Sequence, residues 1–483
     1  MKLARHTLLN LLGLGAPLLF ALLAIPALLA GLGTDRFGLL ALIWAVTSYF
    51  GLFDLGLGRA LTLRLAMTLE RGDQEDVGAL CATALTVLTA LGVLGGLLLA
   101  ALAPWGAARV AGEREQREVL MSTLLMATAL PAVTLTSGLR GILEARQRFD
   151  LVNLVRLPLG LWTFAGPWLA MVWIGPSLLP VTASLVLGRW VALIVHAQLV
   201  RHDLPGLKSG MRWRAAWLRP LLTTGGWMTL SNLISPFMGY VDRFLIAGLL
   251  SAGAVAYYAT PLEVVIKLSV VPAALSAALF PSLAGLLLRD AAGSWQACER
   301  ALIWLAVAMA ATAVPLALAA PQFLAWWVGA EFAAHSGLLM RVFCLGIAIN
   351  SLAHVPLTLL QSGDAARLPA MLHCIELPVF LAALWALTWR FGLEGAALAW
   401  LLRMGADTLL LFAACFHHYG RRSLAMLSPR LGMALLGLVL GFAALLVGPM
   451  QAVIMLLATF LLSLGALWPD LSRGLRRGDG ALR

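Results

Sequence analysis

The sequence predicts an all-α protein that crosses a membrane many times, and three observations support this. Of the 483 residues, 61% are hydrophobic and only 12% are charged, about half the charged share that is typical of soluble domains. The hydrophobic residues form runs of about 20 or more, the length that a helix needs to cross the hydrocarbon core. Lys and Arg residues gather between alternate runs, as expected of a multi-pass protein.

About fourteen apolar segments are long enough to be transmembrane helices. The chain opens with Lys2, Arg5 and an apolar run, which is the pattern of a signal peptide, but the run is too long and more spans follow it, so we interpret it as the first span. The predicted spans lie at about 7–32, 37–58, 77–104, 119–143, 151–174, 176–200, 220–250, 252–286, 301–328, 334–362, 368–389, 391–416, 431–448 and 450–468.

The distribution of positive charge predicts the orientation of these spans. With the N-terminus in the cytoplasm, 23 of the 34 Lys and Arg residues fall in cytoplasmic segments, 5 on the opposite side and 6 within spans. We therefore expect both termini in the cytoplasm. The net charge of +11 then needs no nucleic acid as a partner.

The most basic loop, residues 201–219, divides the chain. It predicts an N-terminal lobe of six spans (1–210), a C-terminal lobe of six spans (211–420) and two further spans with a basic cytoplasmic tail (421–483). Ala30-Gly31-Leu32 and Ala247-Gly248-Leu249 end the first span of each lobe and suggest a pseudo-repeat. Repeated lobes of transporters usually hold the substrate between them and rock to alternate access.

Charged residues inside the spans are the candidate functional residues. Even the lenient scales assign a cost of about 2.5–3.5 kcal/mol to a charge at the bilayer centre, so such residues need a polar surrounding. The cations are Arg156, Arg189, Arg243, Lys267, Arg341 and Arg403, and the acids are Asp242, Glu263, Glu376 and Asp407. Two pairs, Glu263 with Lys267 and Arg403 with Asp407, are spaced four residues apart and can neutralise one another on one helix face.

The six cations are the predicted substrate-binding residues. Arg156, Arg189 and Arg341 have no acid at helical spacing. The planar guanidinium suits phosphate and keeps its charge when buried, so a series of such cations favours the passage of an anionic head group. The structural alternative is that each Arg extends to the interface or pairs with an acid on another helix.

The acids are the candidates for ion coupling. His373 and Glu376 share a helix face and are the strongest candidates for proton coupling, with Glu263 and Asp242 as further candidates. His196 and His354 also lie in spans and are interpreted as packing residues. The coupling ion would be H⁺ or Na⁺.

Known catalytic motifs are absent from the sequence. It contains no HExxH, GxSxG, Walker A or GxGxxG pattern. The first outer loop has Asp35 as its single acid, where a membrane glycosyltransferase would need acids to hold a metal. We therefore expect a protein that is not an enzyme and that has no cofactor and no metal site.

Several short motifs together resemble the polysaccharide transporter family, the O-antigen and exopolysaccharide flippases of the multidrug/oligosaccharidyl-lipid/polysaccharide superfamily. The motifs are Asn10 to Gly15 with Pro17, Gly31-Leu32-Gly33, Phe37-Gly38, Phe53-Asp54-Leu55-Gly56-Leu57-Gly58 with Arg64, Asp242-Arg243-Phe244-Leu245-Ile246-Ala247-Gly248 with Tyr257-Tyr258, and Leu279-Phe280-Pro281-Ser282-Leu283.

The resemblance implies a fold like that of multidrug and toxin extrusion (MATE) transporters and a location in the inner membrane. It implies a flippase that moves a polyprenyl-diphosphate-linked oligosaccharide through a cationic cavity, with a polysaccharide polymerase and glycosyltransferases as functional partners. Three alternatives stay open: a MATE-type drug/cation antiporter, a lipid II flippase, and a membrane glycosyltransferase or scaffold. The first span has no charged residue of the kind that the first two carry there.

Overall fold

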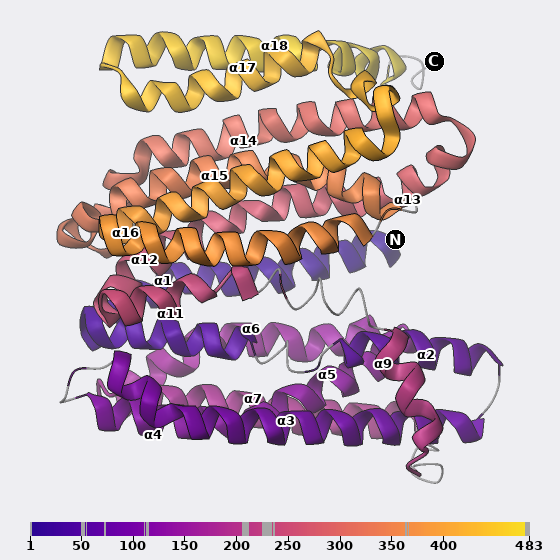
Figure 1. The fold of residues 1–483 in the computed structure, drawn as a ribbon, viewed down its shortest axis with the longest axis vertical. Coiled ribbons are helices and arrows are strands. Elements are labelled where there is room, and N and C mark those ends of the chain that lie inside the picture. The colour runs from indigo at the N-terminus through magenta and orange to yellow at the C-terminus, as the bar shows by residue number, and fades with distance from the viewer. Residues whose placement is uncertain are drawn as a thin grey trace. The chain divides into compact units, whose positions relative to one another are not determined.

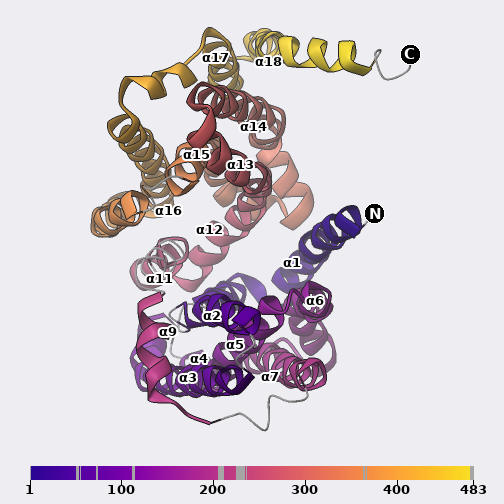
Figure 2. The same ribbon diagram turned by 90° about the vertical axis from the view of Figure 1, so that its right-hand side faces the viewer.

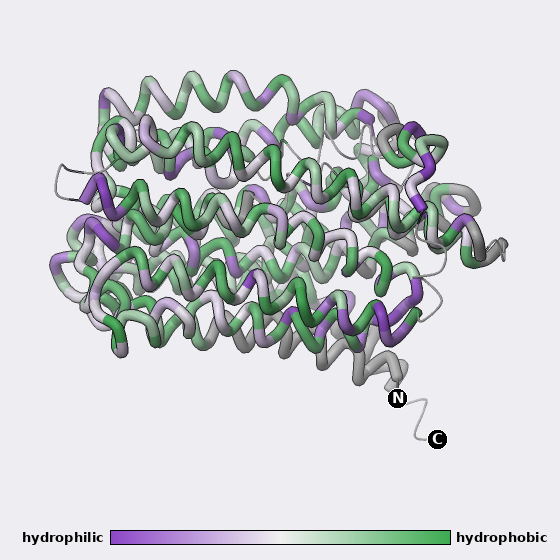
Figure 3. Tube along the Cα trace, turned by 90° about the horizontal axis from the view of Figure 1, so that it is seen from below, coloured by the Kyte–Doolittle hydropathy of each residue, from purple (hydrophilic) through white to green (hydrophobic). Residues whose placement is uncertain are grey.

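The computed structural model describes residues 2–49, 54, 56–71, 74–110, 112, 115–204, 212–224, 234, 237–362, 365 and 367–478. All regular structure in these residues is helical, and 11 of the helices are long and apolar enough to cross a membrane. Hydrophobic residues follow most of the length of the helices, and hydrophilic residues gather at helix ends and turns (Figure 3). The prediction of an all-α multi-pass membrane protein is confirmed.

Two of these helices contain a sharp turn at a glycine. Helix α1 (Lys2–Tyr49) is non-helical at Gly33, with φ 77°, and α16 (Arg367–Tyr419) is non-helical at Gly392, with φ 60°. Glycine adopts positive φ at little cost because it has no Cβ. Each of these two helices is far longer than the roughly 20 residues needed to cross a bilayer. Each therefore contains two of the predicted spans, and the count of about fourteen agrees with the structure.

Contacts between helices divide the chain into two compact units, Met1–Ala256 (unit 1) and Tyr257–Arg483 (unit 2). The lobe boundary predicted near residue 210 stays a prediction, because residues 205–211 and 225–233 lie outside the described part of the chain. The predicted span 220–250 falls partly in these gaps.

In unit 1, α1 packs on α6, α6 packs on α7, and α5 lies against α2, α3 and α7 (Figures 1 and 2). The helices of unit 1 are α1, α2 (Leu57–Arg71), α3 (Gln74–Val110), α4 (Gln116–Ala127), α5 (Leu130–Ala145), α6 (Phe149–Ile174), α7 (Leu178–Asp203), η2 (Ala215–Trp217), α9 (Leu218–Thr224), α11 (Val241–Leu249) and the start of α12 (Ala252–Val265). Leu61, Leu80 and Leu143 lie in its largest described core.

In unit 2, α15 packs between α14 and α16, and the last two helices, α17 and α18, pack on one another and on α14 (Figure 1). The elements are the rest of α12, η3 (Ile266–Ser269), α13 (Val270–Arg289), α14 (Ala291–Val328), α15 (Ala330–Ser362), α16, η4 (Gly420–Met426), α17 (Pro429–Ala443), η5 (Ala444–Leu446) and α18 (Pro449–Gly478). Because lipid is as apolar as leucine, close packing rather than hydrophobic burial holds such helices together.

Candidate functional site

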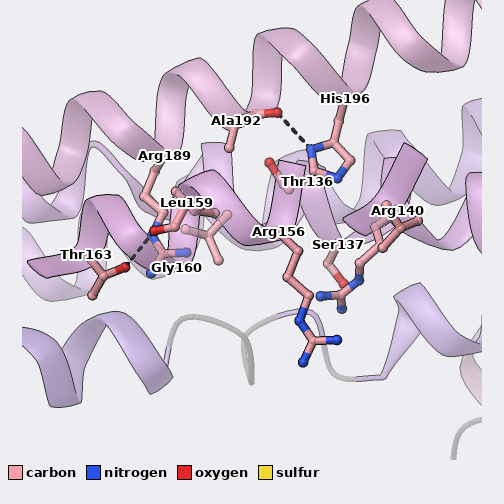
Figure 4. Close-up of a pocket in the computed structure, with 12 residues that line it drawn as sticks. Thr136, Ser137, Arg140, Arg156, Leu159, Gly160, Thr163, Arg189, Ala192 and His196 are labelled. Carbon is pink, nitrogen blue, oxygen red and sulfur yellow. Dashed lines mark hydrogen bonds between the residues drawn. The ribbon is translucent and has the colours of Figure 1, made fainter. Parts of the chain in front are cut away.

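A polar pocket of about 490 Å³ lies between α5, α6 and α7 of unit 1 (Figure 4). Each of the three helices contributes one arginine: Arg140 from α5, Arg156 from α6 and Arg189 from α7. The lining residues are Val133, Thr136, Ser137, Arg140, Val152, Arg156, Leu159, Gly160, Thr163, Arg189, Ala192 and His196. No acid lines the pocket, so its charge is positive.

The pocket brings together two of the predicted substrate-binding residues, Arg156 and Arg189. In the part of the chain that the structure describes, no carboxylate forms an ion pair with either of them. The third arginine has a partner, because Arg140 Nε lies 3.6 Å from Glu144 Oε1. Two guanidinium groups that line one pocket without an acid among its lining residues can attract an anion.

The side chains around these arginines can accept and donate hydrogen bonds. Figure 4 shows Arg189 near Thr163, whose hydroxyl donates to the Leu159 carbonyl at 2.9 Å. His196 Nδ1 lies 2.8 Å from the Ala192 carbonyl, and because a carbonyl only accepts, this nitrogen carries the proton. His196 was interpreted as a packing residue, and its bond within α7 agrees with that role, although it also lines the pocket.

The sequence motif around Asp54 contacts the pocket from outside, through the pocket residue Ser137. The Ser137 hydroxyl, which lines the pocket, donates a hydrogen bond to Asp54 Oδ2, and the Gly56 amide donates to Asp54 Oδ1 at 2.8 Å. A Cβ added at Gly58 would lie 2.4 Å from Ser137 Oγ. Glycine at this position therefore lets α2 approach α5 closely. Residues 50–53 and 55 of the motif region lie outside the described part.

Charged residues beside the pocket's helices are paired, in contrast to Arg156 and Arg189. Arg146 Nε lies 2.5 Å from Asp203 Oδ2, and Arg148 pairs with both Asp203 and Asp150. The hydrogen bond with Asp150 is the main cause that raises the pKa of Arg148 above its ordinary value. This network ties the turn between α5 and α6 to the end of α7.

Unit 2 holds a different kind of charged cluster, on the two halves of α16. Arg403 Nε lies 3.4 Å from Glu376 Oε1, and His373 Nε2 lies 3.4 Å from Asp407 Oδ1. Asn350 of α15 donates to Asp407 Oδ2 at 2.8 Å. Glu376 and His373 are 6% and 9% exposed. The predicted pair His373 and Glu376 is thus present, together with Asp407, which the sequence assigned to Arg403.

This cluster brings ligating atoms of His373, Glu376 and Asp407 within 4.8 Å of one another. Oxygen and imidazole ligands at this spacing can bind a proton or a cation. Arg403 supplies a positive charge to the same group and also lies over the Phe380 ring, 5.2 Å from its centroid. The contacts of Arg403 with Glu376 and of His373 with Asp407 cross from one half of α16 to the other, and the expected pairing of Arg403 with Asp407 along one helix stays a prediction.

The remaining candidates lie apart from both clusters. Lys267 Nζ lies 3.5 Å from Glu263 Oε2, as the sequence predicts. Arg341 Nε donates to the Ala317 carbonyl at 3.3 Å. In α11, Arg243 is 3% exposed and Asp242 is fully buried, and the Arg243 guanidinium lies 4.6 Å from the Tyr240 ring centroid. Neither Arg341 nor Arg243 lines the pocket of unit 1.

Sequence reasoning missed two residues. Arg140 was assigned to a cytoplasmic segment by the count of positive charges, yet it lines the pocket. The polar run Thr134, Thr136 and Ser137 just before it was a signal that this helix face is not lipid-facing. Asn350, an amide within an apolar span, was the corresponding signal in unit 2.

Known proteins resemble this chain over most of its length. A family model described as "Polysaccharide biosynthesis protein" matches residues 3–287. A protein of Shigella flexneri described as "Putative O-antigen transporter" is 29% identical over 413 residues, which cover 85% of this chain and 97% of that protein.

Solved structures share the fold at low sequence identity. A multidrug resistance MATE family transporter of the MOP superfamily in its inward-facing conformation has a TM-score of 0.72 at 14% identity, over 86% of this chain and 98% of its own. A MOP superfamily transporter from Pyrococcus furiosus, whose binding pocket is described as having reverse polarity, has a TM-score of 0.62 at 13% identity, over 88% of this chain and 96% of its own. The expected MATE-like fold is confirmed.

Proposed function

Because this chain belongs to the polysaccharide biosynthesis protein family, we propose that it moves a polyprenyl-diphosphate-linked oligosaccharide across the inner membrane by alternating access. The resemblance to the polysaccharide transporter family is confirmed by the family match and by the curated O-antigen relative. The observation that carries the proposal is the pocket of unit 1, where Arg156 and Arg189 lie without an acid partner in the described part of the chain.

The chemistry of the pocket suits a diphosphate. A diphosphate carries several oxygen acceptors and negative charges, and guanidinium groups bind such oxygens in bidentate pairs. The hydroxyls of Thr136, Ser137 and Thr163 line the same pocket and can bind further oxygens of the phosphate or of the first sugar. Arg156 and Arg189 attract a negatively charged substrate, whereas they would not attract a neutral substrate and would repel a cationic one.

The other predicted cations take secondary roles in this proposal. Arg243 and Arg341 are assigned to further contacts with the diphosphate, because the sequence predicts both as substrate-binding residues. Arg403 and Lys267 each have an acid within 3.5 Å, so part of their charge is already compensated. The predicted cationic passage between two lobes stays a prediction.

We assign ion coupling to the cluster of Glu376, His373 and Asp407, with Glu263 and Asp242 as the weaker candidates. Two acids and one arginine leave this cluster one positive charge short of neutrality when His373 is neutral. One proton or one monovalent cation would complete it, and a buried cluster strongly favours neutrality. H⁺ and Na⁺ are therefore both kept as coupling ions.

Drug/cation antiport is the second candidate function, because the solved structures with this fold include multidrug transporters. A cationic drug would be repelled by the three arginines that line the pocket. The charge of the pocket therefore favours the oligosaccharide carrier.

A double substitution tests the proposal. Cells in which Arg156→Gln and Arg189→Gln replace the natural protein should lose surface polysaccharide and accumulate its lipid-linked precursor on the cytoplasmic side. Arg201→Gln is the matched control, because Arg201 is an exposed residue of α7 that does not line the pocket. Normal polysaccharide together with reduced efflux of a cationic dye would instead establish the antiporter.

A further inference from the structure

A second hollow, of about 300 Å³, lies along the same two helices as the arginine pocket. It is formed by α6 and α7 alone, and its lining side chains are aliphatic or proline apart from the indole of Trp162. We call it the α6–α7 groove. It has no charged residue, in contrast to the three arginines of the pocket.

The groove and the pocket lie on two sides of the contact between α6 and α7. On α7 the groove is lined by Leu187, Val191 and Val195, whereas the pocket is lined by Arg189 and His196. Residues offset by one or two positions point in different directions on a helix of 3.6 residues per turn. Leu159 and Ala192, both labelled in Figure 4, line both hollows. These two side chains are therefore the partition between the hydrocarbon groove and the cationic pocket.

Trp162 forms a closed apolar floor for the groove. Its indole nitrogen donates to the Ser184 carbonyl at 2.8 Å, so no polar group of the ring is left to attract sugar or water. A Cβ added at Gly188 would lie 2.5 Å from Trp162 Cδ1, and one at Gly166 would lie 2.8 Å from Trp162 Nε1. The two glycines thus form a notch that holds the ring against the helices.

The rim of the groove is open and apolar. Leu154, Leu187 and Val191 are 61%, 56% and 49% exposed. Such side chains in a membrane protein face hydrocarbon. A lipid chain can therefore enter the groove from the side without crossing a polar barrier.

We propose that the α6–α7 groove binds the first isoprenyl units of the lipid carrier while Arg156 and Arg189 bind its diphosphate; this inference rests on the proposed function. A prenyl chain is joined directly to its phosphate, so its hydrocarbon begins at the first carbon. In a phospholipid, by contrast, a glycerol and two esters separate phosphate from acyl chain. The groove shares Leu159 and Ala192 with the arginine pocket. It therefore fits a prenyl diphosphate, in which no glycerol separates the hydrocarbon from the phosphate.

Photo-crosslinking in lipid nanodiscs tests the groove directly. A benzophenone amino acid is placed at Val191, which lines the groove, or at Ile194, which is similarly exposed on α7 but does not line it, at 49% and 53% exposure. The nanodiscs contain phosphatidylethanolamine and phosphatidylglycerol, and the probe is radiolabelled polyprenyl diphosphate. We expect labelling at position 191 to exceed labelling at position 194 by at least about fivefold, and excess unlabelled polyprenyl diphosphate to abolish it while phosphatidylglycerol does not.

A steric substitution gives an independent measurement. Val191→Phe should weaken binding of polyprenyl diphosphate about tenfold, the effect of losing roughly two buried methylenes. It should leave binding of inorganic diphosphate unchanged, and Ile194→Phe should change neither. Equal labelling at positions 191 and 194, or displacement by phosphatidylglycerol, would show that the groove holds ordinary bilayer lipid and would overturn the inference.

Failure of the groove and failure of the proposed function give different results. If the groove is wrong but the function is right, Arg156→Gln with Arg189→Gln still abolishes binding of inorganic diphosphate, while labelling at position 191 shows no preference. If the function is wrong, the double substitution leaves binding of inorganic diphosphate unchanged.

Discussion

The two units surround the arginines of their membrane helices in opposite ways. In unit 1, Arg156 and Arg189 line a pocket that contains no acid. In unit 2, Arg403 lies 3.4 Å from Glu376, beside His373 and Asp407. An uncompensated cation can bind an external anion, whereas a compensated one stabilises its own helix pair and responds to a proton or cation. Under the proposed function, this difference separates the substrate site from the ion site.

The largest expected effect concerns the pair of Arg403 and Glu376 in unit 2. Arg403→Gln should lower the free energy of unfolding by about 3–5 kcal/mol, because it leaves the carboxylates of Glu376 and its neighbour Asp407 without the compensating charge of the arginine. Thermal melting of the purified protein in detergent measures this. Glu376→Gln combined with Arg403→Gln should recover most of the loss.

Glu263→Gln is the matched control for that measurement. Its pair with Lys267 is 33% and 45% exposed, so its loss should cost only about 0.3–0.5 kcal/mol. An Arg403→Gln variant as stable as Glu263→Gln would show that the Glu376–Arg403 pair does not hold the two halves of α16 together.

The next effect concerns the binding of diphosphate in the pocket of unit 1, which is lined by Arg156 and Arg189. Arg189→Glu should weaken binding of inorganic diphosphate by about a hundredfold, or about 2.8 kcal/mol, because it replaces an attractive charge by a repulsive one and gives Arg156 an internal partner. Equilibrium dialysis with labelled diphosphate measures this. Arg201→Glu, at an exposed position of α7 away from the pocket, should have little effect, and equal losses for both variants would mean that only net charge matters.

A smaller effect is expected where the Asp54 motif meets the pocket wall. Gly58→Ala should lower the free energy of unfolding by about 1–3 kcal/mol, the cost of overpacking a tight contact, because its Cβ would lie 2.4 Å from Ser137 Oγ. Thermal melting detects it. Gly106→Ala is the control, because an added Cβ there has no neighbour within 4 Å; equal melting temperatures for the two variants would contradict the close approach of α2 and α5.

In the smallest effect, the change in the free energy of unfolding has opposite signs in the two units. Arg189→Gln should raise the free energy of unfolding by about 1 kcal/mol in the absence of ligand, because it removes a charge that has no acid partner in the described residues. The same substitution at Arg403 should lower it. A lower free energy of unfolding in both variants would mean that Arg189, like Arg403, stabilises the fold.

Local sequence rules predicted the helices and the contacts within one helix. Apolar runs located the spans, Gly31-Leu32-Gly33 located the turn in α1 at Gly33, and spacing predicted the ion pair of Glu263 with Lys267. These features depend on residues close together in the chain, so periodicity and spacing determine them.

Contacts between helices could not be predicted from the sequence in the same way. The contacts of Arg403 with Glu376 and of Asp407 with His373 depend on the packing of two helix segments. The entry of Arg140 into the pocket depends on how α5 faces α6 and α7. Spacing along one helix carries no information about that packing. For Arg156 and Arg189, the sequence predicted only that their own helices carry no acid at helical spacing.

The turn at Gly392 has a consequence for how the protein is made. The contacts of Glu376 with Arg403 and of His373 with Asp407 are placed symmetrically about residue 390, so the two halves of α16 form one hairpin. If the hairpin enters the lipid as a unit, the charge of Arg403 is already compensated by Glu376, so the translocon need not release this arginine into hydrocarbon by itself. Biogenesis of unit 2 can thus proceed two helices at a time, with Gly392 as the hinge of insertion.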